Sequence, residues 1–157
     1  MLIRSVAEGD LEQVLALLHA KAAFDGCPTA MVATVDSLRT ALFAPTPIAH
    51  ALVAVTGAHV VGIATYYATF STFLSRPGIW LDDLYVEEAS RGQHIGRHLV
   101  ARLSEIAVER GCARIDWHVL ETNERGRAFY ESIGARIHSS ERLMRLSDDA
   151  ISALAAT

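Results

Sequence analysis

A loop containing two glycines and two arginines joins an apolar, acid-bearing stretch to a segment with helical periodicity. The loop reads RGQHIGR over residues 91–97. A helix N-terminus presents unpaired N–H groups and a partial positive charge, and a glycine-bearing turn before it lets the backbone approach an anion closely. Arg91 and Arg97 add full positive charge. The pattern predicts a pyrophosphate site, although an ordinary loop with solvated arginines has the same composition.

This loop differs from two common phosphate-binding motifs. No Gly-Lys-Ser/Thr sequence follows it, which excludes a P-loop. The strand before it does not open a βαβ unit with a ribose-binding acid downstream, so a dinucleotide-binding fold fits poorly.

Two adjacent acids, Asp82 and Asp83, precede the loop in the apolar stretch WLDDLYV of residues 80–86. Neighbouring residues of a strand point to opposite faces, so we expect only one of the two carboxylates to face a site beside the loop. Buried carboxylates need a cation, a hydrogen-bond network or water. A purely structural role, in which an acid pairs with a basic neighbour in the sheet, is open for Asp83 in particular.

Apolar periodicity assigns these residues to the elements of an α+β (mixed α/β) domain. Helices are expected over 9–22, 36–43, 94–111 and 123–134, and strands over 2–7, 48–70 (a hairpin turning at 56–58), 78–86, 112–120 and, as one or two terminal strands, 135–147. Asp10 and Gln13 predict a capping box at the first helix, and Asn123 is the expected N-cap of the last one. This order of elements predicts helices around a central sheet.

Length and composition restrict the possible classes of protein. The 157 residues predict a single domain, 1–157, and a hydrophobic content of 51% supports a sizeable core. A net charge of −4 argues against broad nucleic-acid binding. Two cysteines, Cys27 and Cys112, make neither a disulfide framework nor a metal site. We find no membrane-spanning stretch and no secretory signal, so a cytoplasmic location is expected.

Two separated motifs together resemble the acetyl-CoA-dependent N-acetyltransferases of the GNAT superfamily. One is the Arg-Gly-Gln-x-Ile-Gly loop of residues 91–96, and the other runs from Asn123 to Tyr130 and on into Ile-Gly-Ala. The segments YYATFSTF, LDDLYV and VLETNERGRAFY look closest to the spermidine/spermine (diamine) acetyltransferase group. The resemblance implies a central, mostly antiparallel sheet of six or seven strands with splayed middle strands, flanked by about four helices.

The resemblance also implies acetyl-CoA as the cosubstrate. The backbone of residues 84–86 would pair with the pantetheine arm in the way that an added strand does. The loop would hold the pyrophosphate, and the start of the last helix would contact the cofactor from the other side. The implied cofactor-binding residues are Leu84, Tyr85, Val86, Arg91, Gly92, Gln93, His94, Ile95, Gly96, Arg97, Asn123 and Arg125.

Acetyl transfer to an amine needs a neutral amine, a stabilised thioester oxygen and a protonated or otherwise stabilised leaving thiolate. The resemblance implies that Tyr130 faces the sulfur, where its phenol would donate the proton. Spacing alone would instead favour a packed helical aromatic. Asp82 matches the acid that lies in the substrate site of the diamine group, and it is our candidate for the catalytic base.

The same resemblance implies an acceptor site lined by Asp25, Asp82, Asp116 and His118, and the aromatic Phe24 beside Asp25 is expected to wall an aliphatic chain there. Structural roles are open for these residues as well. Phe24 and Asp25 also fit an ordinary helix-end loop, and His118 fits a hydrogen-bonded strand position. Alternation along the strand places Trp117 on the opposite face, in the core.

The chain departs from the family pattern at two positions. His94 stands where glycine is usual, and it would carry a penalty if the position requires a positive φ. Arg142, in Glu141-Arg142, replaces one acid of a pair that would help to hold a polycation. The change favours a shorter diamine or a lysine-like amino acid, whose carboxylate Arg142 would bind.

Three functions follow as alternatives. The first is N-acetylation of a small primary amine by direct attack in a ternary complex, and the second is N-acetylation of a protein or peptide. The third is a non-catalytic acyl-CoA-binding regulatory module, suggested by His94. The expected partners are a small-molecule amine and a second copy in a homodimer, with no nucleic acid, membrane or metal.

Overall fold

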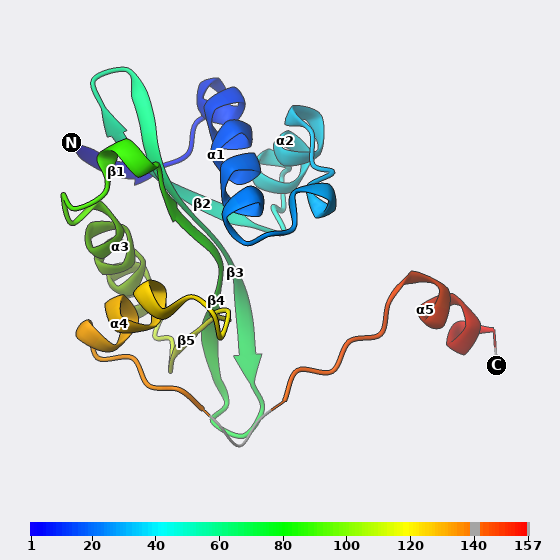
Figure 1. Ribbon diagram of the computed structural model, residues 1–157. Coiled ribbons are helices and arrows are strands. Elements are labelled where there is room, and N and C mark those ends of the chain that lie inside the picture. Colours follow the sequence, from blue (N-terminus) through cyan, green and yellow to red (C-terminus); the bar gives the residue numbers. More distant parts are fainter. Residues whose placement is uncertain (139–141, 157) are drawn as a thin grey trace. The chain divides into compact units, whose positions relative to one another are not determined.

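The computed structural model of the chain describes residues 1–138 and 142–156 (Figure 1). They form two compact units, Met1–Leu120 and a second unit that begins at Glu121. The first unit contains the sheet and most of the residues predicted to bind ligands.

The first unit is built on one sheet with the strand order β1-β2-β3-β4-β5. Strands β1 to β4 are antiparallel to their neighbours, and β5 runs parallel to β4. Consecutive apolar residues in β2 and in the first half of β3 give both faces of the sheet a hydrophobic surface, because successive side chains point to opposite faces. The strands are β1 Leu2–Ser5, β2 His50–Thr56, β3 His59–Ser71, β4 Arg76–Val86 and β5 Ile115–Asp116.

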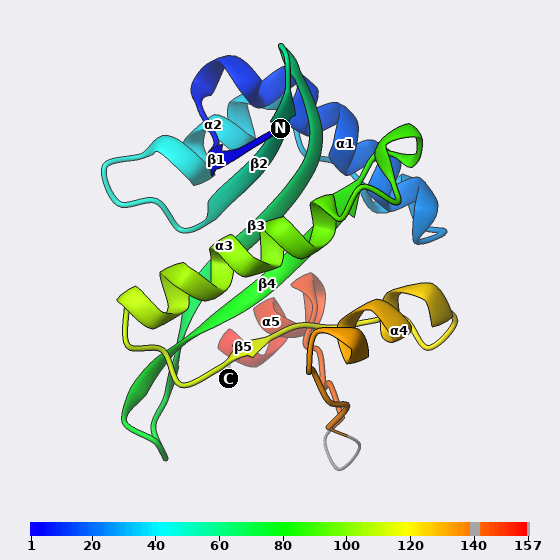
Figure 2. The same ribbon diagram turned by 90° about the vertical axis from the view of Figure 1, so that its left-hand side faces the viewer.

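Helices cover both faces of this sheet (Figure 2). Helix α3 (Ile95–Glu109) packs on one face, while α1 (Leu11–Phe24) and α2 (Val35–Phe43) pack on the other. The second unit contributes α4 (Glu124–Ser132) and α5 (Asp148–Ala155). Among the described residues, no helix combines the length and the apolar character needed to cross a membrane.

The sheet separates two hydrophobic clusters. On the α3 side, Leu99 and Leu103 pack against Ile79 and Leu81 of β4. On the α1 side, Val14 and Leu18 pack against Val53 and Ile63. The residues of α3 that recur at a 3.6-residue period, among them Ile95, Leu99, Leu103 and Ile106, are therefore the buried ones.

The predicted α+β class is confirmed, but the number of elements differs. The described part of the chain has five strands rather than six or seven, and five α-helices rather than about four. The described residues of the expected terminal strands, 135–138 and 142–147, form no ladder, and residues 139–141 lie outside the described chain. A segment becomes a strand only where a neighbouring edge accepts its hydrogen bonds, which apolar alternation alone does not reveal.

The predicted capping box of Asp10 and Gln13 is wrong. The Asp10 carboxylate accepts the backbone N–H of Ala7 at 2.7 Å and a bidentate pair of bonds from Arg4 at 2.6 and 2.9 Å. The Gln13 side chain accepts the N–H of Val60 at 2.9 Å. Both side chains are thus used to attach the start of α1 to other segments, and neither caps the helix.

Candidate active site

Strands β4 and β5 diverge after a very short contact. They pair only at Ile79 with Ile115 and at Trp80 with Asp116. From Leu81 to Val86, β3 is the only strand that pairs with β4 within the described first unit. The outer edge of this part of β4 therefore presents backbone groups to which an extended ligand can add as a strand does. Leu84, Tyr85 and Val86, the predicted cofactor-pairing residues, lie on this edge.

A β-bulge lies at Asp82. The register runs from Tyr66 opposite Leu81 to Thr65 opposite Asp83, which leaves Asp82 as the extra residue. Leu81 and Leu84 consequently both belong to the α3 side, although strict alternation would separate them. The expectation that Asp82 and Asp83 point to opposite faces is therefore wrong. The bulge turns both carboxylates toward the α1 side.

An acidic cluster formed by Asp25, Asp82 and Asp83 lies at this bulge, with Lys21 as its cation. Lys21, in the last turn of α1, forms ion pairs with Asp25 and, at 3.6 Å from Nζ to Oδ1, with Asp83. The Thr65 hydroxyl donates to the other Asp83 oxygen at 3.2 Å, and it accepts the Asp83 N–H at 3.0 Å. Asp82 is exposed to solvent.

The pKa of Asp83 is raised above its ordinary value. Burial is the main cause, because it penalises the charged form. The positive charge of Lys21 and the Thr65 hydrogen bond act in the opposite direction, while the nearby negative charges of Asp82 and Asp25 add to the increase. The predicted pairing of Asp83 with a basic neighbour is therefore present, but its partner comes from a helix.

A group of ring side chains on β3, β4 and the segment after β5 lies near the acidic cluster. Trp80 stacks on Tyr67 with ring centroids 6.4 Å apart, and the His118 ring meets Trp80 edge-on at 4.6 Å. Burial and the negative charge of Asp82 raise the pKa of Tyr67. Trp117 packs against the hydrophobic cluster on the α3 side, as predicted. Asp116, another residue of the predicted acceptor site, forms an ion pair with Arg114, at 2.7 Å.

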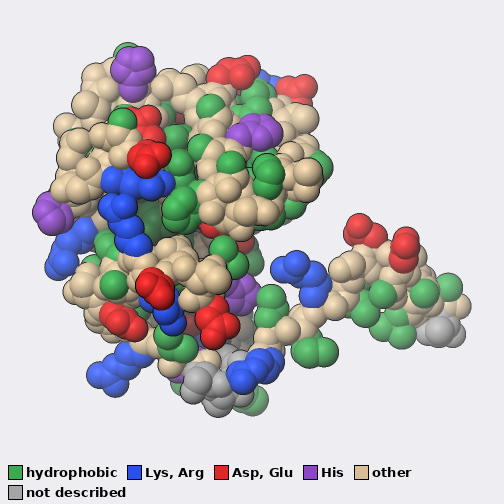
Figure 3. Space-filling view, viewed as in Figure 1, with side chains coloured by type: hydrophobic (Ala, Val, Ile, Leu, Met, Phe, Trp, Pro, Cys, Tyr) green, Lys and Arg blue, Asp and Glu red, His purple; other side chains and the backbone are tan. Residues whose placement is uncertain are grey.

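The predicted phosphate loop has the backbone of an anion-binding turn. Gly92 has a φ of 83°, and His94 has a φ of 59° at the residue before α3 begins. The position thus does require a positive φ, and histidine adopts it with its side chain exposed. The first α3 N–H bonded within the helix is that of His98, so the N–H groups of residues 95–97 have no acceptor in the helix. Basic side chains gather over the start of α3 (Figure 3).

Arg91 connects this loop with the acidic side of the sheet. Its Nε donates to the Val86 carbonyl at 3.1 Å. Its guanidinium lies 5.1 Å from the ring centroid of Phe24 and 5.4 Å from that of Tyr85, within cation–π range. Sequence reasoning placed Phe24 and Arg91 in separate subsites, and no pattern in the sequence links them. Arg97 is exposed.

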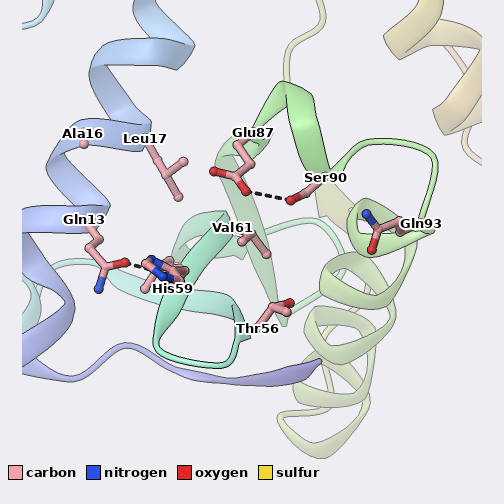
Figure 4. A pocket seen from close by; sticks show the side chains of 10 residues that line it. Gln13, Ala16, Leu17, Thr56, His59, Val61, Glu87, Ser90 and Gln93 are labelled. Atoms are coloured by element: carbon pink, nitrogen blue, oxygen red, sulfur yellow. Dashed lines mark hydrogen bonds between the residues drawn. The ribbon is translucent and has the colours of Figure 1, made fainter.

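A cleft of about 510 Å³ lies between α1, the β2–β3 hairpin and the loop that precedes α3 (Figure 4). Gln93 reaches it from the loop, and Gln13 and Leu17 reach it from α1. Glu87 lies on its wall and accepts the Ser90 hydroxyl at 2.6 Å. None of the three acids of the acidic cluster lines this cleft. The geometry of the bulge and the loop, rather than the size of the cleft, therefore defines the candidate site.

The second unit holds the remaining predicted residues. Asn123 caps α4, since its side chain accepts the Gly126 N–H at 2.8 Å, as predicted. A Cβ at Gly126 would lie only 2.5 Å from the Asn123 side chain, so the cap depends on this glycine. Tyr130 is half-buried beside Phe129, with ring centroids 5.2 Å apart. Arg125 and Arg142 are exposed.

Known proteins resemble this chain in sequence and in structure. Residues 15–135 match the acetyltransferase (GNAT) family. Thialysine N-epsilon-acetyltransferase of Bos taurus is 33% identical over 144 residues, covering 87% of this chain and 84% of that protein. Spermidine/spermine N(1)-acetyltransferase-like protein 1 of Homo sapiens is 32% identical over 146 residues, covering 88% of this chain and 21% of that protein. An integron cassette protein from the mobile metagenome of V. cholerae has a similar structure, with a TM-score of 0.81 and 25% identity, covering 99% and 98% of the two chains.

Proposed function

The chain belongs to the acetyltransferase (GNAT) family, and from this premise we propose that it transfers the acetyl group of acetyl-CoA to a primary amine of a small molecule. One observation carries the proposal. An acidic cluster that suits a cationic amine lies at a bulge in β4, beside an edge of β4 that no described strand of the first unit pairs with after Trp80, and near a loop whose backbone suits an anion.

The residues of the loop and the strand edge fit the cosubstrate. A Cβ added at Gly92 would meet no atom within 4 Å, so the turn is open to a ligand. The free N–H groups at the start of α3, together with Arg97, suit the charge of a diphosphate. The edge of β4 at residues 84–86 suits the amide groups of a pantetheine arm. When bound, acetyl-CoA supplies an activated acetyl thioester.

Asp82 is the residue that we propose as the base. An alkylammonium has a pKa of about 10 and must lose a proton before its nitrogen can attack. The exposed Asp82 carboxylate can take that proton directly or through water, while the less exposed Asp83 is occupied by Lys21 and Thr65. A new N–C bond then forms as the C–S bond breaks, and the thiolate leaves.

Tyr130 is the residue that we propose to protonate the leaving thiolate. A phenol has a pKa of about 10 and so carries its proton at neutral pH, whereas the thiol formed from the leaving thiolate has a pKa of about 8.5. Tyr130→Phe should lower kcat by about a hundredfold, as expected for loss of a general acid, and leave the Kd of acetyl-CoA within about twofold. Tyr66→Phe is the matched control, because Tyr66 is buried in the α3-side cluster. Loss of acetyl-CoA binding in Tyr130→Phe would instead assign Tyr130 to packing.

The acceptor that we propose is a diamine, a polyamine or a lysine-like amino acid. The three acids at the bulge support a substrate with at least one ammonium group, and the aromatic side chains of Tyr67 and Trp80 support an aliphatic chain between the charges. One relative named above acts, by its name, on thialysine, and another is named for its likeness to a spermidine/spermine acetyltransferase. Both of these substrate types carry primary amines at the end of a short chain.

A screen for acetyl-CoA-dependent thiol release tests the proposal. The panel contains diamines, polyamines, lysine analogues and aminoglycosides, and we expect turnover with at least one of the first three classes. Thermal unfolding with acetyl-CoA and with CoA is measured in parallel, since a ligand that binds the native state raises the apparent stability. Stabilisation without thiol release from any amine would contradict the proposal and favour a non-catalytic acyl-CoA-binding module.

A further inference from the structure

Lys21 is the only lysine of the chain. Thirteen of the fourteen basic residues are arginines. The single lysine lies in the acidic cluster, where it forms ion pairs with Asp25 and Asp83. Its side chain is only 20% exposed, so the ammonium group is largely enclosed by the cluster.

The position of Lys21 places a compact ammonium where part of a cationic substrate would otherwise lie. An ammonium is a small point charge on a flexible stem, whereas a guanidinium is a wide, planar fork. Lys21 Nζ reaches Asp25 one helical turn away and Asp83 across on β4. The chain thus supplies its own primary ammonium to two of the three acids.

Charge balance follows from this arrangement. Asp25, Asp82 and Asp83 contribute −3 when ionised, and Lys21 contributes +1, which leaves −2. Such a cluster can neutralise two further positive charges. A diamine brings two, and a lysine-like amino acid brings two ammonium groups and one carboxylate. Spermidine and spermine bring three and four, and each additional like charge near Lys21 costs binding energy.

Building on the proposed function, we propose that Lys21 selects the acceptor by charge, admitting amines with no more than two ammonium groups and excluding tri- and tetra-amines. Lys21 thereby acts on specificity rather than on the chemical step. Its removal should free two carboxylates for the substrate and improve the use of longer polyamines.

The test compares Lys21→Met with the wild type in the thiol-release assay. We measure kcat/KM for propane-1,3-diamine, spermidine and spermine at low ionic strength, where electrostatic effects are least screened. Lys21→Met should raise the spermidine-to-diamine ratio of kcat/KM by about tenfold, mainly through KM. Lys21→Arg should leave the ratio near that of the wild type, because it keeps the charge.

Arg39→Met is the matched control for net charge. Arg39 lies on α2 and pairs with Asp36 and Glu8, outside the acidic cluster. Arg39→Met should not change the ratio. An unchanged ratio in Lys21→Met, or an equal change in Arg39→Met, would overturn the inference. Thermal unfolding of Lys21→Met serves as the folding check, and Lys21→Gln replaces it if Met at this position prevents folding.

Failure of the inference can be separated from failure of the proposed function. If the wild type releases no thiol with any amine, the proposed catalysis is wrong. Charge selection is then read from binding, as the rise in unfolding temperature that spermine causes in the wild type and in Lys21→Met. A larger rise in Lys21→Met supports the inference, and an equal or smaller rise overturns it.

Discussion

His94 adopts a left-handed backbone conformation, with φ 59° and ψ 15°, directly before α3. This conformation costs an L-residue roughly 1–2 kcal/mol, and glycine does not pay that cost. The imidazole of His94 is exposed. Substitutions at this position can therefore separate the cost of backbone strain from any contact of the imidazole with the cofactor. His94→Gly should raise the free energy of unfolding by up to about 1 kcal/mol and tighten acetyl-CoA binding by a few fold, measured by denaturant unfolding and calorimetry.

His94→Ala provides the matched comparison, because it removes the imidazole but keeps a Cβ in the left-handed conformation. We expect its acetyl-CoA affinity to stay close to that of the wild type. Weaker binding in both variants would show that the imidazole contacts the cofactor, and that histidine at this position serves binding.

Asp83 should reduce stability at neutral pH. Burial raises its pKa in the folded state above the unfolded value, so the stability it contributes is present below the unfolded pKa and is lost as pH rises through the folded pKa. Asp83→Asn should therefore raise the free energy of unfolding by about 1 kcal/mol at neutral pH, and the gain should shrink as the pH falls toward ~4. Thermal unfolding across this pH range checks the prediction.

The exposed Asp36, whose side chain is 91% exposed, provides the control as Asp36→Asn, with a change close to zero. A loss of stability in Asp83→Asn at every pH would mean that the Thr65 hydrogen bond and the Lys21 pair outweigh the cost of burying the carboxylate.

The candidate site residues of the loop and of the acidic cluster could be predicted from the sequence, but the contacts that they make could not. The pattern at Arg91–Arg97 predicts an anion-binding turn, because glycines and arginines before a helix have a local meaning, and the structure places a turn with two positive-φ residues there. Lys21 carried no such signal, since its partner Asp83 is distant in the sequence and is brought near only by the packing of α1 on the sheet.

At the scale of elements, long periodic segments were predictable and strand irregularities were not. The buried stripe of α3 follows from a 3.6-residue period. The bulge at Asp82 breaks the two-residue alternation, and WLDDLYV contains no glycine to mark it. Strand β5 is much shorter than its apolar segment because β4 diverges from it, and this depends on three-dimensional pairing.

The link between β1 and α1 depends on Asp10. Hydrogen bonds from Arg4 are the main reason why the pKa of the Asp10 carboxyl is lowered, and the Ala7 N–H adds to the effect against the opposing influence of burial. A lowered folded pKa gives stability that is present above the unfolded pKa and lost as pH falls through the folded pKa. Asp10→Asn should lower the free energy of unfolding by about 1–3 kcal/mol at neutral pH, and by less in acid.

The pH dependence distinguishes Asp10 from Asp83, since the two substitutions should have opposite signs at neutral pH. Denaturant unfolding of both variants under the same conditions makes the comparison. A neutral effect of Asp10→Asn would mean that the uncharged amide keeps the Arg4 and Ala7 contacts at no cost.

At the scale of the whole molecule, the second unit exposes an apolar surface. Between the described residue 142 and α5, the side chains of Leu143, Met144 and Leu146 are 61%, 88% and 52% exposed, and Ile151 of α5 is 51% exposed. Large exposed apolar patches mark interaction sites. If the expected homodimer forms, these side chains of the second unit are the surface that we predict a second copy covers.

The oligomeric state should therefore depend on this segment. We expect light scattering after size-exclusion chromatography to give twice the mass of the 17.0 kDa chain, and the double substitution Leu143→Ser/Met144→Ser to shift the population toward the monomer. Because Val32 is 83% exposed and lies in the first unit, Val32→Ser is the matched control and should keep the dimer. A monomeric wild type at micromolar concentration would contradict the expectation. A dimer that withstands the double substitution would instead place the interface on the first unit, where the edge strand β1 offers unpaired backbone groups on its outer side.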